Sequence, residues 1–381
     1  MATLGVGIIG YGFMGRIYAY AHRNLRFFYS PAPCETRLVG ACVRRAETMD
    51  EVRAHGGFEL VTTDAQELLD RPDIHMVYVA TPNHLHAPLV LQALDAGKAV
   101  YCDKPLCLNE EEALRIAERA GSASQVHRMG LHCRFIPAVM KARELVEAGA
   151  LGRIYQFRGE YLHSGYIEPD RPFSWRLDKA RSGGGALFDL GAHIVDALRW
   201  LVGDIGSVRS LLATQVLQRP RAKGSAELVP IEVDDIALMM VRAKSGAVGT
   251  IEATRLATGS NDEMRFEIHG DRGAIAFNAQ DPAYLAFYDA SAEGEPLGGR
   301  RGYTRIECVQ RYAPPAVWPG PKFSLGYLRF QVHSVYAFLT AVAAAHPAEP
   351  DLVDGAKTQL ILAAAQRSAE SGLEETVTPL D

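Results

Sequence analysis

Several features are scarce or missing in this 381-residue sequence, and each absence excludes a class of protein. The six cysteines form no Cys-x-x-Cys pair, which argues against a zinc site or a disulfide framework and favours reduced, buried thiols. No apolar run reaches the ~20 residues of a membrane span. Basic residues are not in excess, because the formal net charge is −5, so neither nucleic acid nor a membrane surface is expected as a partner.

The N-terminus also lacks the marks of an export signal. The segment MATLGVGIIGYG has no basic start, no long apolar core and no small-residue cleavage site. It enters a strand-like pattern at once, so we expect an uncleaved protein that works in the cytoplasm. The chain is too long for one ordinary core, which predicts at least two domains.

Strand-like apolar runs alternate with helical patterns through the first third of the chain. The expected strands are 4–10, 37–43, 57–60, 75–81, 99–105 and 126–132, and helices are expected between them. Such alternation with short connections predicts a doubly wound parallel sheet covered on both faces. Ligands of these sheets bind at the carboxyl ends of the strands, where the strand order reverses.

The first of these strand ends carries the sequence Gly10-Tyr11-Gly12-Phe13-Met14-Gly15. A Gly-x-Gly-x-x-Gly turn between a strand and a helix lets a pyrophosphate approach the backbone and the helix N-terminus. The alternative is a structural turn that binds nothing. The position at the start of an alternating domain favours dinucleotide binding, with Gly10, Gly12, Phe13, Met14 and Gly15 as candidate contacts.

The end of the second strand bears on the choice between NAD and NADP. An acidic residue there would bind the adenosine ribose of NAD, but the sequence has Arg44 and Arg45 instead. The two arginines could hold a 2′-phosphate, or they could be solvated or stack on adenine in an enzyme that uses NAD. The sequence therefore does not decide between NAD and NADP.

Two later strand ends carry unusual polar residues. Thr81, Asn83, His84 and His86 follow the fourth strand, either as cofactor contacts or as a capping turn with Thr81 or Asn83 as the cap. Lys104 follows the fifth strand, where a lysine is costly without a partner or a task, and Pro105 stiffens the backbone after it. A surface lysine is the alternative.

Residues 183–200, GGGALFDLGAHIVDALRW, predict an amphipathic helix that begins after three glycines. Asp189 and His193 lie one turn apart on a face other than the apolar one. The pair could be a surface salt bridge, half of a metal site or an acid/base device. A zinc site would need a third ligand and would suit His-x-x-x-His better, so no metal is expected. Asp196, further along the same face, is expected to be structural.

Three segments together resemble the glucose–fructose oxidoreductase / inositol dehydrogenase / MocA (Gfo/Idh/MocA) family. They are GIIGYGFMG, VATPNHLHAPLVLQALDAGKAVYCDKPL and GGGALFDLGAHIVDALRWLVG, and the stretch GALGRIYQFRGEY also fits. The resemblance implies an NAD(P)-binding Rossmann domain over 1–128. It also implies an α/β domain over 129–381, with a large, mainly antiparallel sheet that binds substrate and forms oligomer contacts.

By position, the resemblance assigns the catalytic lysine, aspartate and histidine of the family to Lys104, Asp189 and His193. The chemistry agrees, because oxidation of a secondary alcohol needs a base such as histidine and a cation beside the developing alkoxide. Asp103 stands where the family usually has glutamate, and it is a further cofactor candidate. Trp175 and Arg176 are candidates near the nicotinamide. Substrate-binding candidates, besides the three catalytic residues, are Arg134, Tyr161, His163 and Trp175.

The pattern changes after residue 206. Strand-like runs with hairpin turns continue to about residue 278, residues 281–320 read as irregular, and two helices at about 325–345 and 352–371 close the chain. One uncovered sheet face predicts a homo-oligomer, a dimer or a tetramer.

These observations predict an oxidoreductase that transfers a hydride between a nicotinamide cofactor and a secondary alcohol of a pyranose sugar or cyclic polyol. A second hypothesis is a redox-neutral, NAD-dependent glycoside hydrolase that works by oxidation, elimination, water addition and re-reduction. A third is a nucleotide-binding protein without activity. The sequence does not separate the first two.

Overall fold

The computed structural model describes residues 3–309, 312–318, 320, 323–324 and 326–380. The described chain forms two compact units. Unit 1 comprises residues 1–135, 313–320 and 326–357, and unit 2 comprises 136–312, 321–325 and 358–381.

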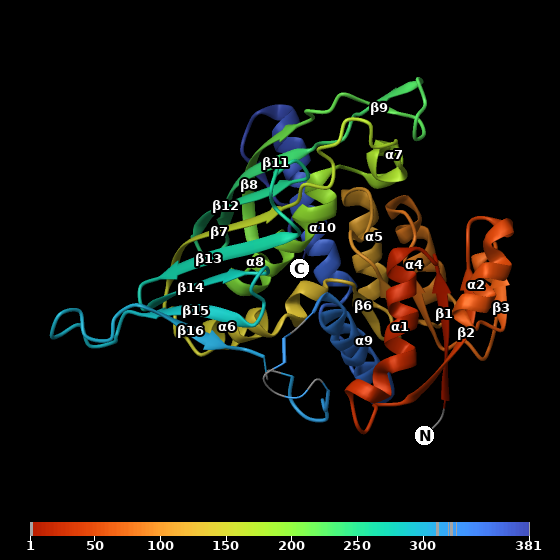
Figure 1. The fold of residues 1–381 in the computed structure, drawn as a ribbon, viewed down its shortest axis with the longest axis horizontal. Coiled ribbons are helices and arrows are strands. Elements are labelled where there is room, and N and C mark those ends of the chain that lie inside the picture. Colours follow the sequence, from red (N-terminus) through yellow and green to blue (C-terminus); the bar gives the residue numbers. More distant parts are fainter. Residues whose placement is uncertain (1–2, 310–311, 319, 321–322, 325, 381) are drawn as a thin grey trace. The chain divides into compact units, whose positions relative to one another are not determined.

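Unit 1 is built on a six-stranded sheet in the order β3-β2-β1-β4-β5-β6, with every pair parallel (Figure 1). The strand order reverses between β1 and β4, which is where ligands of doubly wound sheets bind. This confirms the predicted fold class of the first domain. The strands are β1 (Thr3–Ile9), β2 (Glu35–Cys42), β3 (Leu60–Thr62), β4 (Met76–Val79), β5 (Ala99–Cys102) and β6 (His127–Met129).

The helices of unit 1 begin where the sequence offers caps and apolar stripes. Asn109 caps α5 by accepting a hydrogen bond from the amide of Glu112, and Asp64 caps α3 in the same way through Gln66. The helical elements are α1 (Phe13–Phe28), η1 (Ala46–Thr48), α2 (Met49–Gly56), α3 (Ala65–Leu69), η2 (Asn83–Leu85), α4 (His86–Asp95), α5 (Glu110–Gly121), η3 (His132–Phe135) and α9 (Tyr327–Ala344).

Helix α9 belongs to unit 1, although the expected boundary at residue 128 placed it in the second domain. Its buried residues Val335 and Phe338 join the core cluster that also holds Tyr78 and Tyr101 of the sheet. The Phe338 ring packs edge-on against both tyrosine rings. Burial of this stripe fixes the helix to the first sheet, and a contact so distant in sequence leaves no local signal.

Unit 2 is built on a nine-stranded sheet in the order β16-β15-β14-β13-β7-β12-β11-β8-β17. The β7–β12 pair is parallel and the other pairs are antiparallel, so the sheet is mixed but mainly antiparallel, as expected. The strands are β7 (Ile154–Leu162), β8 (Ile205–Ala213), β11 (Ile236–Ala243), β12 (Val248–Thr254), β13 (Glu263–Gly270), β14 (Gly273–Asn278), β15 (Tyr284–Asp289), β16 (Tyr303–Glu307) and β17 (Glu375–Thr376), with a separate pair β9 (Gln218–Pro220) and β10 (Leu228–Pro230).

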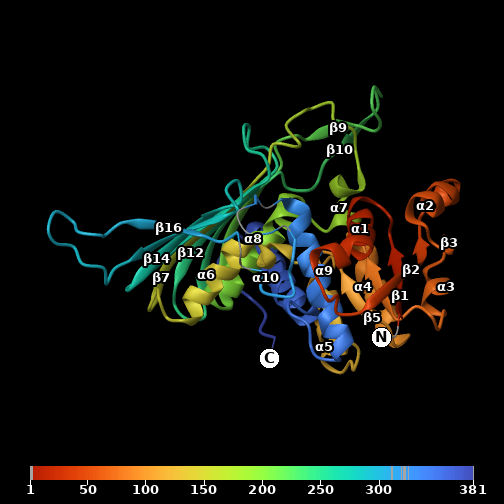
Figure 2. The same cartoon turned by 60° about the horizontal axis from the view of Figure 1, so that its bottom comes forward.

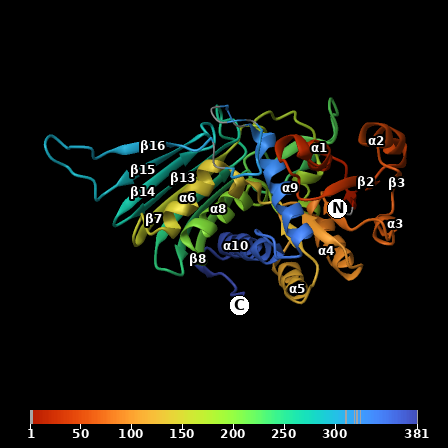
Figure 3. The same cartoon turned by 90° about the horizontal axis from the view of Figure 1, so that it is seen from below.

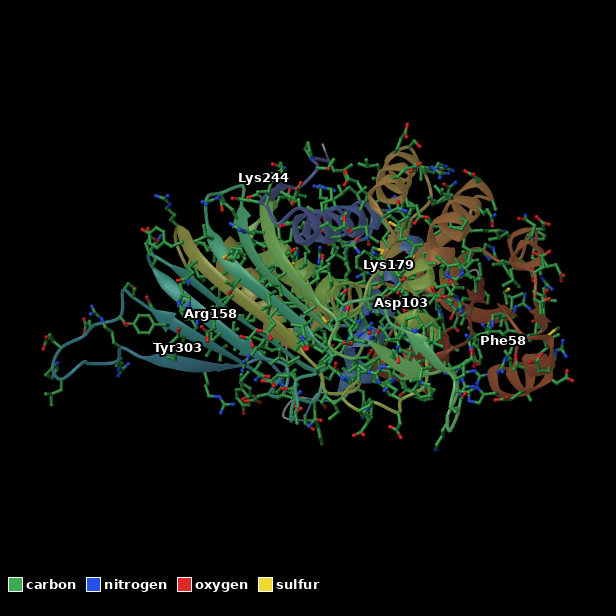
Figure 4. All side chains as sticks on the ribbon, turned by 90° about the horizontal axis from the view of Figure 1, so that it is seen from above. Phe58, Asp103, Arg158, Lys179, Lys244 and Tyr303 are labelled. Atoms are coloured by element: carbon green, nitrogen blue, oxygen red, sulfur yellow. The ribbon has the colours of Figure 1, made fainter. Side chains whose placement is uncertain are left out.

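One face of this sheet is covered by helices and the other is open. Helices α6 (Pro137–Glu147) and α8 (Ala192–Val202) lie along the covered face (Figures 2 and 3). Side chains of the open face include Arg158 and Tyr303, labelled in Figure 4. The remaining helical elements of the chain are η4 (Trp175–Leu177), α7 (Lys179–Ser182), η5 (Leu187–Gly191) and α10 (Leu352–Ser371).

The expectation that residues 281–320 are irregular is wrong in part. Strands β15 and β16 form there and extend the sheet at one edge. The segment contains the tripeptides Tyr-Leu-Ala and Tyr-Thr-Arg but has little alternation, so pairing with β14 rather than local pattern makes these strands.

Two expectations about composition hold in the structure. All six cysteines are buried, and no disulfide joins them. No helix among the described residues is long and apolar enough to cross a bilayer.

Buried histidines make the stability of unit 1 depend on pH. Burial lowers the pKa of His22 to about 3, and burial together with the charge of Lys104 lowers the pKa of His132 to about 3. The pKa of His86 is also lowered by burial. Because the ordinary value is 6.5, the unfolded chain binds protons that the folded unit does not, so stability is full above that pH and is lost as the pH falls below it.

We therefore expect acidification from pH 7.5 to 5.5 to lower the free energy of unfolding, by up to about 1.4 kcal/mol per histidine and pH unit below the ordinary pKa. Urea unfolding at both pH values measures the effect. The His22→Asn variant should show a shallower pH dependence, whereas the same change at the exposed His346 should leave it unaltered. Equal stability of the wild type at the two pH values would contradict the account.

Candidate active site

The glycine-rich turn after β1 has the geometry of a nucleotide-binding loop. Gly10 has φ +96°, and a Cβ on it would lie 2.4 Å from the carbonyl oxygen of Ala80. A Cβ on Gly15 would lie 2.1 Å from the carbonyl oxygen of Gly10. A Cβ on Gly12, by contrast, would meet nothing within 4 Å. Gly10 and Gly15 are thus needed for packing, whereas Gly12 borders open space.

The N-terminus of α1 faces that space without a partner of its own. No side chain caps the helix, and its first turn has no acidic residue. Helix N-termini leave backbone N–H groups unsatisfied, and these groups favour an anion such as a pyrophosphate. Phe13 is 69% exposed, and the hydroxyl of Tyr327 lies 4.0 Å from the sulfur of Met14. Tyr327, the first residue of a distant helix, carries no local signal that would have selected it.

Arg44 and Arg45 are both exposed just after β2. The Nε atom of Arg45 lies 3.6 Å from a carboxylate oxygen of Glu47, an exposed ion pair that contributes little. The arginines are therefore available to a nucleotide.

In the loop after β4, the capping interpretation is wrong. Pro82 and Leu85 precede the helical turns of η2 and α4, and neither turn has a side-chain cap. His86 is buried, with Nδ1 2.7 Å from the carbonyl oxygen of Pro105 and Nε2 2.9 Å from that of Thr81. The ring therefore joins the loop after β4 to the loop after β5. Asn83 is buried beside it, and His84 is half-buried.

Lys104 is held by its backbone at the carboxyl end of β5. The amide of Asp103 donates to the carbonyl oxygen of Val79, and Oδ1 of Asp103 accepts a 2.9 Å hydrogen bond from the amide of Lys104. Asp103 is buried (Figure 4), and burial raises the pKa of its carboxyl while the charge of Lys104 opposes the shift. Lys104 itself is half-buried. The expected location at a strand end is confirmed.

In unit 2, the helical segment that follows the three glycines begins on a residue far away in sequence. The carboxylate of Asp234 accepts hydrogen bonds from the amides of Gly185 and Leu187, both at 2.7 Å. The carbonyl oxygen of Asp234 accepts from Ala186 at 2.9 Å. A Cβ on Gly185 would lie 1.7 Å from that oxygen, so this approach requires glycine. Asp234 thus replaces a local cap, a role that the sequence did not indicate.

The segment that carries Asp189 is wider than the regular helix expected. Residues 187–191 form a π-helical turn, η5, and α8 begins after it. Such turns are rare and occur often at functional sites. Oδ2 of Asp189 lies 3.1 Å from an Nη atom of Arg255, whose side chain is 2% exposed, while that of Asp189 is 25% exposed. The carboxylate therefore reaches the surface with one oxygen fixed by a buried cation.

His193 lies in the first turn of α8 and is buried. Its ring centroid is 5.6 Å from that of Tyr161, and the hydroxyl of Tyr161 donates to Asp262 at 2.7 Å. Asp196 is fully buried and accepts a hydrogen bond from Thr358, which fits the expected structural role. Unit 2 thus places Asp189, His193 and Tyr161 on neighbouring elements.

The other candidates occupy varied surroundings. Nδ1 of His163 accepts a 2.7 Å hydrogen bond from the amide of Gly165. The guanidinium of the exposed Arg176 lies 4.6 Å from the ring centroid of Trp175, which is half-exposed. In unit 1, Arg134 is buried and paired with Asp354 at 3.3 Å, so its charge is already matched within the protein.

A glycine turn at the switch point of a doubly wound sheet, with a lysine at the end of another strand of that sheet, is typical of a dinucleotide-dependent oxidoreductase. Comparisons with known proteins agree. The model of the oxidoreductase family with an NAD-binding Rossmann fold matches residues 4–131, and the model of the GFO/IDH/MocA C-terminal domain matches residues 139–276. The chain belongs to the Gfo/Idh/MocA family of oxidoreductases, and its cofactor is a nicotinamide dinucleotide.

Relatives with assigned activities are sugar and inositol dehydrogenases. Levoglucosan dehydrogenase of Pseudarthrobacter phenanthrenivorans is 36% identical over 380 residues, which cover 95% of each chain. Myo-inositol 2-dehydrogenase of Thermotoga maritima is 29% identical over 270 residues, 71% of this chain and 74% of that protein. The structure of a levoglucosan dehydrogenase in complex with NADH and levoglucosan has a TM-score of 0.93 at 36% identity and covers 99% of this chain and 100% of that chain.

Proposed function

We propose that the protein oxidises a secondary hydroxyl of a pyranose sugar or cyclic polyol, with NAD as the hydride acceptor and levoglucosan as the first substrate to test. The observation that carries the proposal is the Asp189–His193 pair on η5 and α8, with the carboxylate fixed by Arg255. The similarity to levoglucosan dehydrogenase over 95% of both chains supports the substrate class.

Each proposed residue has one task in this reaction. The bound nicotinamide supplies the acceptor for the hydride that leaves the carbinol carbon. His193 removes the hydroxyl proton as the C–O bond becomes a carbonyl. Lys104 stabilises the negative charge that develops on that oxygen. Asp189 accepts a hydrogen bond from a neighbouring hydroxyl and so orients the ring.

Other side chains contribute binding. The aromatic and polar side chains of Tyr161, His163 and Trp175 suit the apolar faces and hydroxyls of a sugar, and Arg134 is a further candidate. Trp175 and Arg176 are also candidates for the nicotinamide end of the cofactor. On the cofactor side, the exposed Arg44 and Arg45 just after β2 would contact the adenosine ribose. NAD is preferred to NADP because the similar levoglucosan dehydrogenase structures contain NADH. The supply of NAD makes the cytoplasm the expected compartment.

A panel of sugars and polyols tests the proposal, with levoglucosan and myo-inositol included and with NAD and NADP in parallel. The near-ultraviolet absorbance of reduced nicotinamide reports oxidation, and chromatography reports any released aglycone. We expect reduced NAD to accumulate with at least one cyclic substrate. Release of sugar from a glycoside without net reduction of NAD would support a redox-neutral hydrolase instead. Cofactor binding without turnover of any compound in the panel would support a nucleotide-binding protein without activity.

The open face of the nine-stranded sheet is the proposed homo-oligomer surface. Leu211 and Leu238 are directly opposite each other on β8 and β11, and with Met240 they are 57%, 43% and 57% exposed. Adjacent apolar side chains on a flat sheet favour burial against a second copy. Beside them, β7 and β13–β16 enclose a groove of ≈ 390 Å³ lined by charged residues that include Arg158 and Glu160.

We expect the wild type to be a dimer or tetramer and the Leu238→Glu variant to have a lower mass in solution. Light scattering after size exclusion measures the mass. The Leu297→Glu variant changes a fully exposed leucine in a loop outside this face and should leave the mass unaltered. A monomeric wild type at micromolar concentration would contradict the assignment of this face.

A further inference from the structure

Arg255 is a buried arginine held on several sides within unit 2. It follows β12 directly, and its side chain is 2% exposed. Its amide donates to the carbonyl oxygen of Asp235, and its carbonyl oxygen accepts from the amide of Tyr166. Its guanidinium lies 4.6 Å from the ring centroid of Tyr166, a favourable stacking geometry. The backbone and the ring together leave this side chain little freedom.

The guanidinium makes its one described ion pair with Asp189, at 3.1 Å. Its Nε and Nη1 atoms are buried and have no hydrogen-bond partner among the described residues. Burial lowers the pKa of Arg255, but the negative charges of Asp189 and Asp234, with Tyr166, outweigh that effect and leave the pKa raised. A buried arginine that stays charged needs a carboxylate to match it, and the carboxylate of Asp234 already binds two amides.

We propose that Arg255 is a positioning residue for the oxidation: its guanidinium pairs with the carboxylate of Asp189 and fixes the direction of that carboxylate. This inference rests on the proposed function, in which Asp189 orients the substrate. Because Oδ2 of Asp189 pairs with Arg255, the carboxylate presents a defined orientation to a sugar hydroxyl. Removal of the guanidinium takes away this ion pair and the positive charge that disfavours protonation of the carboxylate.

Other charged and titratable groups lie on the elements packed against η5. They are His193, Asp196 and Arg199 on α8, Tyr155, Arg158, Glu160 and Tyr161 on β7, Glu252 on β12 and Arg242 on β11, with Asp234 just before β11 and Tyr166 after β7. Arg199 pairs with Asp196 and Asp204, and Arg158 pairs with Glu267, whereas Arg255 is the arginine whose guanidinium pairs with Asp189. Its removal is therefore expected to favour the protonated form of Asp189.

Arg219 provides a matched control. It is as deeply buried as Arg255, and its guanidinium lies 5.8 Å from the centroid of the same Tyr166 ring. It donates to the backbone carbonyl oxygens of Glu168 and Tyr166, at 2.6 and 2.5 Å. A general loss of packing would thus affect variants at both arginines, whereas a loss of positioning would affect only those at Arg255.

The experiment measures kcat and KM from pH 5 to 10 for sugar oxidation by the holoenzyme. It uses the wild type, Arg255→Lys, Arg255→Met, Arg219→Met and Asp189→Asn. We expect Arg255→Met to lose roughly a hundredfold in kcat/KM, since a misplaced catalytic-site group has about this effect. The acid limb of the pH–rate profile of Arg255→Met should move to higher pH. Arg255→Lys should recover part of the activity, and Arg219→Met should keep the acid limb of the wild type.

The outcomes separate this inference from the proposed function. If Asp189→Asn keeps wild-type kinetics, the proposed role of Asp189 fails. If Asp189→Asn is impaired while Arg255→Met keeps the wild-type acid limb, the inference about Arg255 fails alone. If Arg255→Met does not fold, the test depends on Arg255→Lys. Wild-type activity of Arg255→Lys together with the acid limb of the wild type would overturn the proposal. Adding Arg255→Lys to Asp189→Asn should cost nothing further, since the two residues act as a unit.

Discussion

Replacement of Lys104 by methionine or of His193 by alanine is expected to reduce kcat by about a thousandfold, in the range typical of a lost general base or charge stabiliser. Neither side chain is proposed to anchor the pyrophosphate, so the Kd for NAD should stay within about tenfold of the wild-type value. Steady-state kinetics on the true substrate and fluorescence titration of the cofactor measure the two quantities.

The matched controls are Lys179→Met and His269→Ala. Lys179 is an exposed lysine at the start of α7, and His269 lies on β13 of the sheet (Figure 4 shows Lys179). Both controls should retain wild-type kcat. Near-full activity in either Lys104→Met or His193→Ala would show that the residue has been given the wrong role.

A valine at position 12 is expected to weaken cofactor binding without harm to the fold. A Cβ on Gly12 meets no protein atom within 4 Å, so the branched side chain fits the protein but fills the space open to a pyrophosphate. We expect the Kd for NAD to rise by at least tenfold, with a melting temperature close to that of the wild type. Isothermal titration calorimetry and thermal unfolding without cofactor measure both.

The same substitution at position 15 is the contrasting control. There a Cβ would approach the carbonyl oxygen of Gly10 to 2.1 Å, so Gly15→Val should unfold or strongly destabilise unit 1. Tight NAD binding by Gly12→Val would mean that the cofactor does not use this turn.

The parts of the structure with local causes could be predicted from the sequence. Apolar runs that end in glycine or a polar group located the strands of unit 1, and the glycine spacing located the turn after β1, because backbone conformation and burial act within a few residues. The location of Lys104 at the end of β5 followed from the same pattern. The capping interpretation of Thr81 and Asn83 failed because proline at position 82 and backbone packing form that turn.

The parts with distant causes could not be predicted. Arg255 reads in the sequence as one more arginine after a strand, and only the fold brings it to Asp189, 66 positions away. Asp234 caps a helical segment that begins almost 50 residues earlier, so no capping motif appears next to the glycines. The π-helical turn arises where these two contacts fix both sides of one segment, which sequence periodicity does not report.

Direct hydride transfer tests the central claim most directly. The substrate found in the panel is prepared with deuterium on the oxidised carbon, and the enzyme turns it over with NAD. The account predicts deuterated NADH in equal amount to the oxidised sugar. It also predicts that the label slows the reaction of the wild type, and that His193→Ala forms product about a thousandfold more slowly than the wild type. Product formed without deuterium in the accumulated cofactor, or at the wild-type rate in His193→Ala, would contradict it.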